Sequence, residues 1–121
     1  MDVEASAADR IAVPAVLGLM RIDRWDSRRD GPLTEDALRQ KLERHGYRVS
    51  SHTWAAGTIL PAGPQQTDVA HAVASGIVKL TLDGEIAILT SGDVVYMSRG
   101  AVRRIEVIGS APVCCFEARI E

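Results

Sequence analysis

The chain has few of the residues that cross-link proteins or hold metal ions. Its 121 residues include two cysteines and three histidines. The cysteines, Cys114 and Cys115, are adjacent. Neighbouring residues of a strand point to opposite faces, so we expect no ordinary disulfide between them. The two-residue cysteine spacing of zinc fingers is absent. A site made of imidazole or thiolate ligands would therefore have to draw on a very short list of side chains.

The chain also lacks an excess of positive charge and a long apolar run. It carries 14 basic and 16 acidic residues, a net charge of −2, so we expect no nucleic-acid partner. The longest apolar stretch, Ile11–Met20, is too short to span a bilayer and contains Pro14. The start of the chain, Met1 to Glu4, has no basic region typical of a secretory signal. These features predict a cytoplasmic protein with no membrane partner.

What remains is the composition of an ordinary globular protein. Apolar residues make up 46% of the chain and charged residues 25%, and the length suits one domain. We expect residues 1–32 to lie before the domain and to begin with a tail. The apolar segment Ile11–Met20 would be an extended arm or a first strand. A charged connector would follow, from Arg21 to Pro32. Trp25 is the candidate anchor of that connector. Residues 33–121 would form the single domain.

One helix is predicted, over residues 35–45. Thr34 is a suitable N-cap, because its hydroxyl can accept a backbone N–H of the first turn. Leu38 and Leu42 are four residues apart and share a face. Gly46 suits the position that ends a helix.

The chain after Gly46 has the pattern of a β protein. Its runs are short, rich in Val, Ile and Thr, and separated by Gly, Pro, Asp and Ser. Asp83-Gly84 predicts a tight hairpin. The spacing of the runs indicates a sandwich or barrel rather than βαβ units. The predicted strands are Arg48–Ala55, Asp68–Ala74, Ile77–Leu82, Glu85–Leu89, Val94–Met97, Val102–Ile108 and Val113–Ile120.

The turn glycines carry a more specific resemblance. Gly57 and Gly76 match the two ends of the motif G-x5-H-x-H-x3,4-E-x6-G, and Gly92 and Gly100 match the motif G-x5-P-x-G-x2-H. The chain thus resembles the cupin family, which implies an all-β, double-stranded β-helix (jelly-roll) barrel with the N-terminal helix packed against it. Members of this family commonly pair through sheet edges and N-terminal arms. The resemblance therefore implies a homodimer, with Ile11–Met20 as the candidate arm.

The chain departs from this family at every position that binds the family's metal ion. The residues there are Gly63, Gln65, Val69 and Arg103. Glycine and valine have no ligating side chain, and arginine stays protonated and would repel a cation. Ser98 replaces the usual proline of the second motif. We therefore predict no metal and no other cofactor.

His71 and Arg103 are the main candidate site residues. Alternation places His71 on one face with Val69 and Val73, and the resemblance turns that face into the barrel. An interior histidine could bind a ligand or act as a general base, or it could be a core histidine bonded to a neighbouring oxygen. Arg103 shares a face with Ile105 and Val107. It could bind a carboxylate or phosphate, or it could reach the barrel mouth and pair with a local acid.

Two further interpretations concern the predicted strands Arg48–Ala55 and Val113–Ile120. His52 and Trp54 share a strand face and would line the cavity, or would lie in an interface or on the surface. Cys114 is expected in the core with Phe116, Ala118 and Ile120, whereas Cys115 would face water with Glu117 and Arg119. A rebuilt metal site of His52, His71 and Cys114 is conceivable but lacks the motif positions.

Three functions follow as hypotheses. The first is a metal-independent cupin that binds a small organic molecule, with an anionic one as an option, through Gln65, His71 and Arg103, with His52 and Trp54 as further lining. The second is a metal-free isomerase, cyclase or lyase in which His71 moves a proton and Arg103 stabilises an anion. The third is a structural or interaction module whose barrel is filled by side chains.

Overall fold

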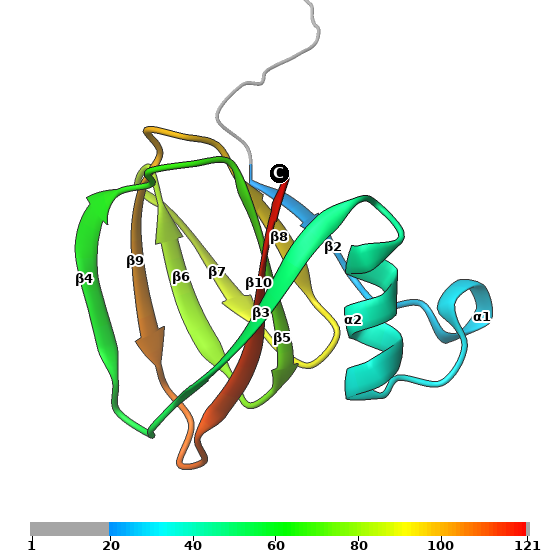
Figure 1. Ribbon diagram of the computed structural model, residues 1–121. Coiled ribbons are helices and arrows are strands. Elements are labelled where there is room, and N and C mark those ends of the chain that lie inside the picture. The colour runs from blue at the N-terminus through cyan, green and yellow to red at the C-terminus, as the bar shows by residue number, and fades with distance from the viewer. Residues whose placement is uncertain (1–19, 121) are drawn as a thin grey trace, which may run out of the picture.

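Two antiparallel sheets pack face to face in the computed structural model, which describes residues 20–120 (Figure 1). The five-stranded sheet has the order β2 (Arg21–Asp23), β8 (Val94–Met97), β5 (Val69–Ser75), β10 (Val113–Ile120), β3 (Tyr47–Trp54). The four-stranded sheet has the order β4 (Ile59–Pro64), β9 (Val102–Val107), β6 (Val78–Leu82), β7 (Glu85–Leu89). The predicted mainly β fold is confirmed.

The core between the sheets is aliphatic. Alternate residues of each strand point inward, as the two-residue period of a strand requires. Val69, Val73 and Val95 come from the five-stranded sheet, and Leu80 and Ile105 come from the four-stranded sheet. All five are buried, and together they join the two sheets into one barrel.

Helix α2 (Glu35–Glu43) covers the outer face of the five-stranded sheet. Its buried side chains Leu38 and Leu42 pack in one cluster with Ala70, Ala72 and Phe116. The alanines are short, so the helix axis can lie close to β5. The central strands of this sheet are consequently buried on both faces.

The predicted helix start is confirmed and its end is two residues too late. The Thr34 hydroxyl accepts the backbone N–H of Ala37 at 3.0 Å. The helix ends at Glu43, and the chain leaves it through a turn in which Gly46 has a φ of 83°. That left-handed conformation suits glycine, so the stop signal was right although the last turn is not helical. No helix among residues 20–120 is both long and apolar enough to cross a membrane.

The segment from Arg21 to Pro32, expected as a charged connector, contains two short elements that the sequence did not predict. Its first residues form β2, which pairs with β8, and a second, one-turn helix, α1, spans Ser27–Asp30. Arg29 pairs with Asp23 and Asp30 within the segment, whereas other charges pair with residues farther along the chain. Arg24 lies 2.6 Å from Asp93, and the Lys41 ammonium group lies 3.2 Å from the carboxylate of Asp30. Spacing within the segment could not reveal these partners.

Trp25 anchors the segment, in agreement with its predicted role. Its indole N–H donates to the carbonyl of Gly31 at 2.9 Å, and the Lys41 ammonium group lies 5.2 Å from the centre of the ring. The indole also packs against Gly92 in the loop before β8.

Strand β4 was missed in the sequence because it contains Pro61, Gly63 and Pro64. Proline cannot donate a hydrogen bond to a ladder, and it is tolerated only at an edge or a bulge. β4 is an edge strand, and its pairing with β9 is irregular between Leu60 and Gly63. Both conditions are therefore met.

The predicted arm Ile11–Met20 lies outside the described residues except for Met20. The backbone N–H of Met20 donates to the Glu85 carboxylate at 3.0 Å, and its side chain packs against the barrel core.

Two glycines with the same backbone geometry should respond differently to substitution. Gly92 and Gly100 have φ values of 91° and 88°. A Cβ at Gly92 would lie 2.5 Å from the Cβ of Trp25, whereas a Cβ at Gly100 would meet no atom within 4 Å. We expect Gly100→Ala to cost about 1 kcal/mol of unfolding free energy from backbone strain alone, and Gly92→Ala to cost about 3 kcal/mol because it adds a clash. Urea unfolding measures both, and equal losses would contradict this packing.

Candidate functional site

His71 lies in the middle of β5 and points between the sheets. Its side chain is 3% exposed and shares the inner face with Val69 and Val73, so the predicted inward orientation is confirmed. The imidazole stacks on the indole of Trp54, with ring centres 5.3 Å apart and planes inclined by 10°. Strands β5 and β3 thus each supply one ring to a buried aromatic pair.

Three buried polar side-chain atoms have no hydrogen-bond partner in the described part of the chain. They are Nδ1 and Nε2 of His71 and Oε1 of Gln65, a residue that is 9% exposed. Buried polar atoms are almost always hydrogen-bonded, to protein or to another molecule. The barrel interior can therefore still form hydrogen bonds with a water molecule or a ligand.

The burial of His71 also fixes its charge. Loss of solvation lowers the pKa of the imidazole to about 4, and the nearby charges of His52 and Arg103 add to the effect. A neutral imidazole offers one donor and one acceptor nitrogen. His71 is therefore neutral at physiological pH and can form one hydrogen bond of each kind.

Arg103 lies on the inner face of β9, half-buried, with Gly63 of β4 on one side and Leu82 of β6 on the other. No hydrogen bond or ion pair joins its guanidinium to another described residue, so the alternative of a local acidic partner finds no support within residues 20–120. A Cβ added at Gly63 would meet no atom within 4 Å. Open space therefore lies beside Arg103.

His52 lies at the margin of this site. Its side chain is 43% exposed, and its Nε2 atom lies 3.8 Å from the Glu117 carboxylate. Of the two residues predicted to line the barrel together, Trp54 thus contacts His71, whereas His52 is largely exposed to solvent.

Glu117 was predicted to face water, and this prediction is wrong. It lies directly opposite His71 in the ladder of β10 and β5, on the same face, with 24% of its side chain exposed. Its carboxylate accepts a hydrogen bond from Arg119 at 2.9 Å. The sequence gave no signal for this placement, because β10 is buried on both faces and its alternation fits either orientation.

The two cysteines are also placed opposite to the prediction. Cys115 is the one in the barrel core, 1% exposed, and burial raises the pKa of its thiol to about 12. Cys114 is half-buried on the other face, with its sulfur 3.9 Å from the hydroxyl of Thr53. A site made of His52, His71 and Cys114 is therefore not assembled.

The residues at the expected metal positions do not fit a metal ion. Gly63 and Val69 offer no ligand atom, Gln65 offers one neutral oxygen, and Arg103 adds a positive charge. Nowhere within residues 20–120 do three His, Cys, Asp or Glu side chains gather in a way that could hold one. The donor set of this end of the barrel suits an anion better than a cation.

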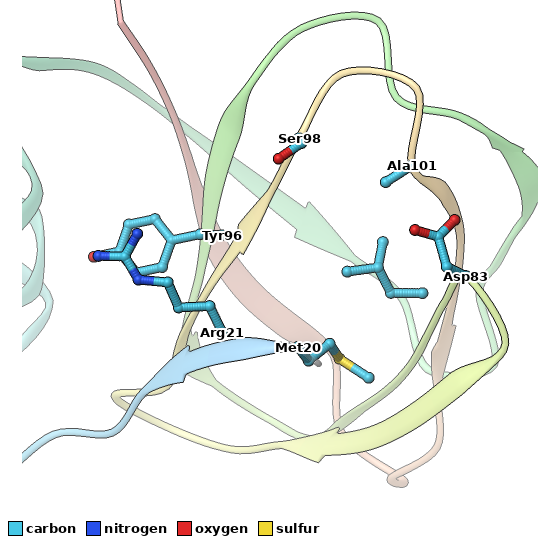
Figure 2. A pocket seen from close by; sticks show the side chains of 7 residues that line it. Met20, Arg21, Asp83, Tyr96, Ser98 and Ala101 are labelled. Atoms are coloured by element: carbon cyan, nitrogen blue, oxygen red, sulfur yellow. The ribbon is translucent and has the colours of Figure 1, made fainter. Parts of the chain in front are cut away.

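A pocket of about 250 Å³ opens at the same end of the barrel (Figure 2). Leu82 in its wall is the register partner of Arg103, and Ala101 in its wall accepts the backbone N–H of Gln65 at 2.8 Å. Figure 2 shows the side chains of Arg21 and Tyr96 against each other, across the pocket from Ala101 and Asp83. The full lining comprises Met20, Arg21, Leu82, Asp83, Tyr96, Ser98 and Ala101.

The low pKa of His71 makes stability depend on pH in a defined window. The unfolded imidazole takes up a proton near pH 6.5 and the folded one only near pH 4, so falling pH favours the unfolded chain between these values. The full effect is about 3 kcal/mol. We expect His71→Gln to remove this part of the pH dependence, measured by urea unfolding, and His45→Gln at the exposed end of α2 to retain it. A His71→Gln variant with the wild-type slope would contradict the buried, neutral imidazole.

Comparisons with known proteins bear on the fold. No protein-family model matches the chain, and no curated protein matches its sequence. Solved structures do match. A cupin protein from Bacteroides fragilis aligns with a TM-score of 0.55 at 24% identity, over 63% of this chain and 66% of that one, slightly under two thirds of its length.

Two further structures agree. An RmlC-like cupin with a double-stranded β-helix fold from Methanocaldococcus jannaschii has a TM-score of 0.55 and 21% identity, over 61% of this chain and 69% of that chain. A DUF861 family protein from Thermotoga maritima has a TM-score of 0.53 and 18% identity, over 82% of this chain and 97% of that one. The order of the strands, the two packed sheets and these neighbours together show that the chain has the cupin fold, a double-stranded β-helix.

Proposed function

We propose that this chain is a metal-independent cupin domain that binds a small organic anion inside the barrel. One observation carries the proposal. A fully buried, neutral histidine has both ring nitrogens without a partner, close to a half-buried arginine with no counter-charge among the described residues. Polar groups in such surroundings are costly unless something pairs with them.

The charge of the site supports an anionic ligand. The guanidinium of Arg103 is always protonated and presents paired N–H groups that match a carboxylate. Glu117 is the nearest inward acid to His71 in the ladder, but its carboxylate already pairs with Arg119. Arg103 therefore remains available for a carboxylate of the ligand.

The neutral groups define the rest of the ligand. His71 can donate one hydrogen bond and accept one, and the free Gln65 oxygen can accept one. A ligand that satisfies them carries a hydroxyl or amide group as well as its carboxylate. Trp54 holds the plane of the His71 ring, and His52 is a further contact at the solvent-exposed margin.

Metal independence rests on the donor set. Arg103 stands where the family pattern places the last metal ligand, and Gly63 and Val69 remove two others. A cation bound there would lack anionic or imidazole ligands and would meet a positive charge.

The second hypothesis, a metal-free isomerase, cyclase or lyase, uses the same residues. His71 has free ring nitrogens that could accept a proton, which favours this hypothesis. A general base works best when its pKa lies near the working pH, however, and the pKa of His71 is about 4. We therefore place binding before catalysis. The third hypothesis, a filled structural module, is less favoured because it leaves the two ring nitrogens of His71 and the Gln65 oxygen without a partner.

Other expectations from the sequence stay part of this proposal. The near-zero net charge supports the absence of a nucleic-acid partner. A homodimer and a cytoplasmic location remain predictions.

Matched acid and amide pairs test the charge of the ligand. Acetate with acetamide, and benzoate with benzamide, differ in charge while their shapes are almost the same. We expect the acids to bind more tightly than the amides, measured by titration calorimetry and by changes in the amide NMR spectrum. Arg103→Gln should weaken acid binding at least about tenfold, because a charge-assisted pair is lost.

Arg104→Gln is the matched control. Arg104 is the next residue on β9, points to the other face of the sheet and pairs with Glu106 at 2.9 Å. Acid binding should be unchanged in this variant. Equal binding of acids and amides, or equal losses in the two arginine variants, would overturn the proposal.

A further inference from the structure

The outer face of the four-stranded sheet presents large apolar side chains to solvent. Both helices of residues 20–120 lie on the side of the other sheet (Figure 1). Five isoleucines on the strands of the four-stranded sheet or directly beside them are between 39% and 62% exposed, namely Ile59, Ile77, Ile86, Ile88 and Ile108. Large apolar side chains gathered on one exposed face are typical of an interaction surface.

The registers of the ladders define a row of side chains across this face. Ile59 of β4 lies opposite Glu106 of β9, and Glu106 lies opposite Lys79 of β6. Lys79 in turn lies opposite Ile88 of β7. The neighbours of these residues in each strand belong to the barrel core or pack against it, so all four side chains point outward. Across the sheet the row therefore reads Ile-Glu-Lys-Ile.

This row is complementary to itself. A two-fold axis that runs along the strands, between β9 and β6, turns the row into Ile-Lys-Glu-Ile. When the rotated row is laid on the original, each isoleucine faces an isoleucine and each charged side chain faces one of opposite charge. A two-fold interface requires such a match, because both copies use the same patch. The occupant that fits this face is therefore a second copy of the chain.

Lys79 distinguishes this axis from the other directions. No ion pair joins its ammonium group to another described residue, whereas Glu106 accepts a hydrogen bond from Arg104 at 2.9 Å. A two-fold axis across the strands would set Lys79 against a second Lys79, Thr81 or Ile77, none of which carries a negative charge. The axis along the strands sets it against Glu106 of the second copy. It also sets Ile77 against Ile108, whose N–H donates to the Ile77 carbonyl at 3.3 Å within each chain.

We propose that two copies of this chain associate through the outer faces of their four-stranded sheets. Lys79 of each copy pairs with Glu106 of the other, and Ile59 of each copy packs on Ile88 of the other. Packed sheets lie about 10 Å apart, a gap that lysine, glutamate and isoleucine side chains fill. Arg103 points to the opposite face of the sheet, so this interface is independent of the proposed ligand.

The size of the face predicts a reversible dimer. Four strands are about 19 Å wide, and the six residues of β9 are about 20 Å long. An interface of this size lies at the low end of the specific ones, so we expect the dimer to dissociate at micromolar concentrations. The isoleucines supply the affinity, and the two Lys–Glu pairs set the orientation of the copies.

Complementary charge reversals test the proposal. Lys79→Glu sets a glutamate against Glu106 of the other copy, and Glu106→Lys sets a lysine against Lys79. We expect each variant alone to self-associate at least about tenfold more weakly than the wild type, measured by sedimentation velocity. Equal amounts of the two variants should form a heterodimer when mixed, because both facing pairs then again combine a lysine with a glutamate.

Arg44→Glu is the matched control. It makes the same change of charge at an exposed residue beside the end of α2, away from the four-stranded sheet, and should dimerise like the wild type. Ile88→Thr keeps a strand-forming residue and should weaken the dimer without a change of charge. A wild-type protein that stays monomeric at high concentration would overturn the proposal. So would a dimer that neither the charge reversals nor Ile88→Thr weakens, because the copies would then meet elsewhere, and so would two folded reversal variants that form no heterodimer.

Discussion

The burial of β5 on both faces is the constraint on which the candidate site depends. Ala70 and Ala72 lie beneath helix α2, so His71, the residue between them, must point into the barrel. It has no path to solvent on its own strand, and its polar atoms are enclosed by apolar neighbours such as Val73. Because helix α2 covers the outer face of β5, the polar side chain of His71 lies in the barrel interior.

Desolvation then decides what this interior can bind. A buried imidazole is held neutral because the charged form would lose its hydration. Arg103, by contrast, stays charged in any surroundings. The site therefore combines one fixed positive charge with neutral hydrogen-bonding groups. The proposal of a small organic anion, rather than a metal ion, rests on that combination.

Much of the fold could be predicted because its signals are local. The turn glycines and the alternating apolar runs located the strands from β5 to β10 within a residue or two, and Thr34 located the start of α2. Elements that depend on residues far away in the sequence were not predicted. Strand β2 is held by β8 and by pairs such as Arg24 with Asp93, which no local pattern shows. Strand β4 looked unlike a strand because an edge tolerates its prolines.

The site was predictable to the same extent. His71 and Arg103 share faces with valine and isoleucine, and that pattern correctly predicted their inward orientation. On β10 the alternation of apolar and polar residues could not show which face points inward, since both faces are buried. Cys115 and Glu117 were therefore predicted on the wrong face. The stacking of Trp54 on His71 depends on how β3 lies beside β10, which only the assembled sheet reveals.

The nitrogen NMR signals of the His71 ring give the most direct test of an anion site in place of a metal site. They would be followed at neutral pH while benzoate, and separately Zn²⁺, is added. The account predicts the signals of a neutral imidazole that move with benzoate and stay fixed with Zn²⁺. A shift of the ring signals that is complete at one equivalent of Zn²⁺, with no shift on addition of benzoate, would contradict it.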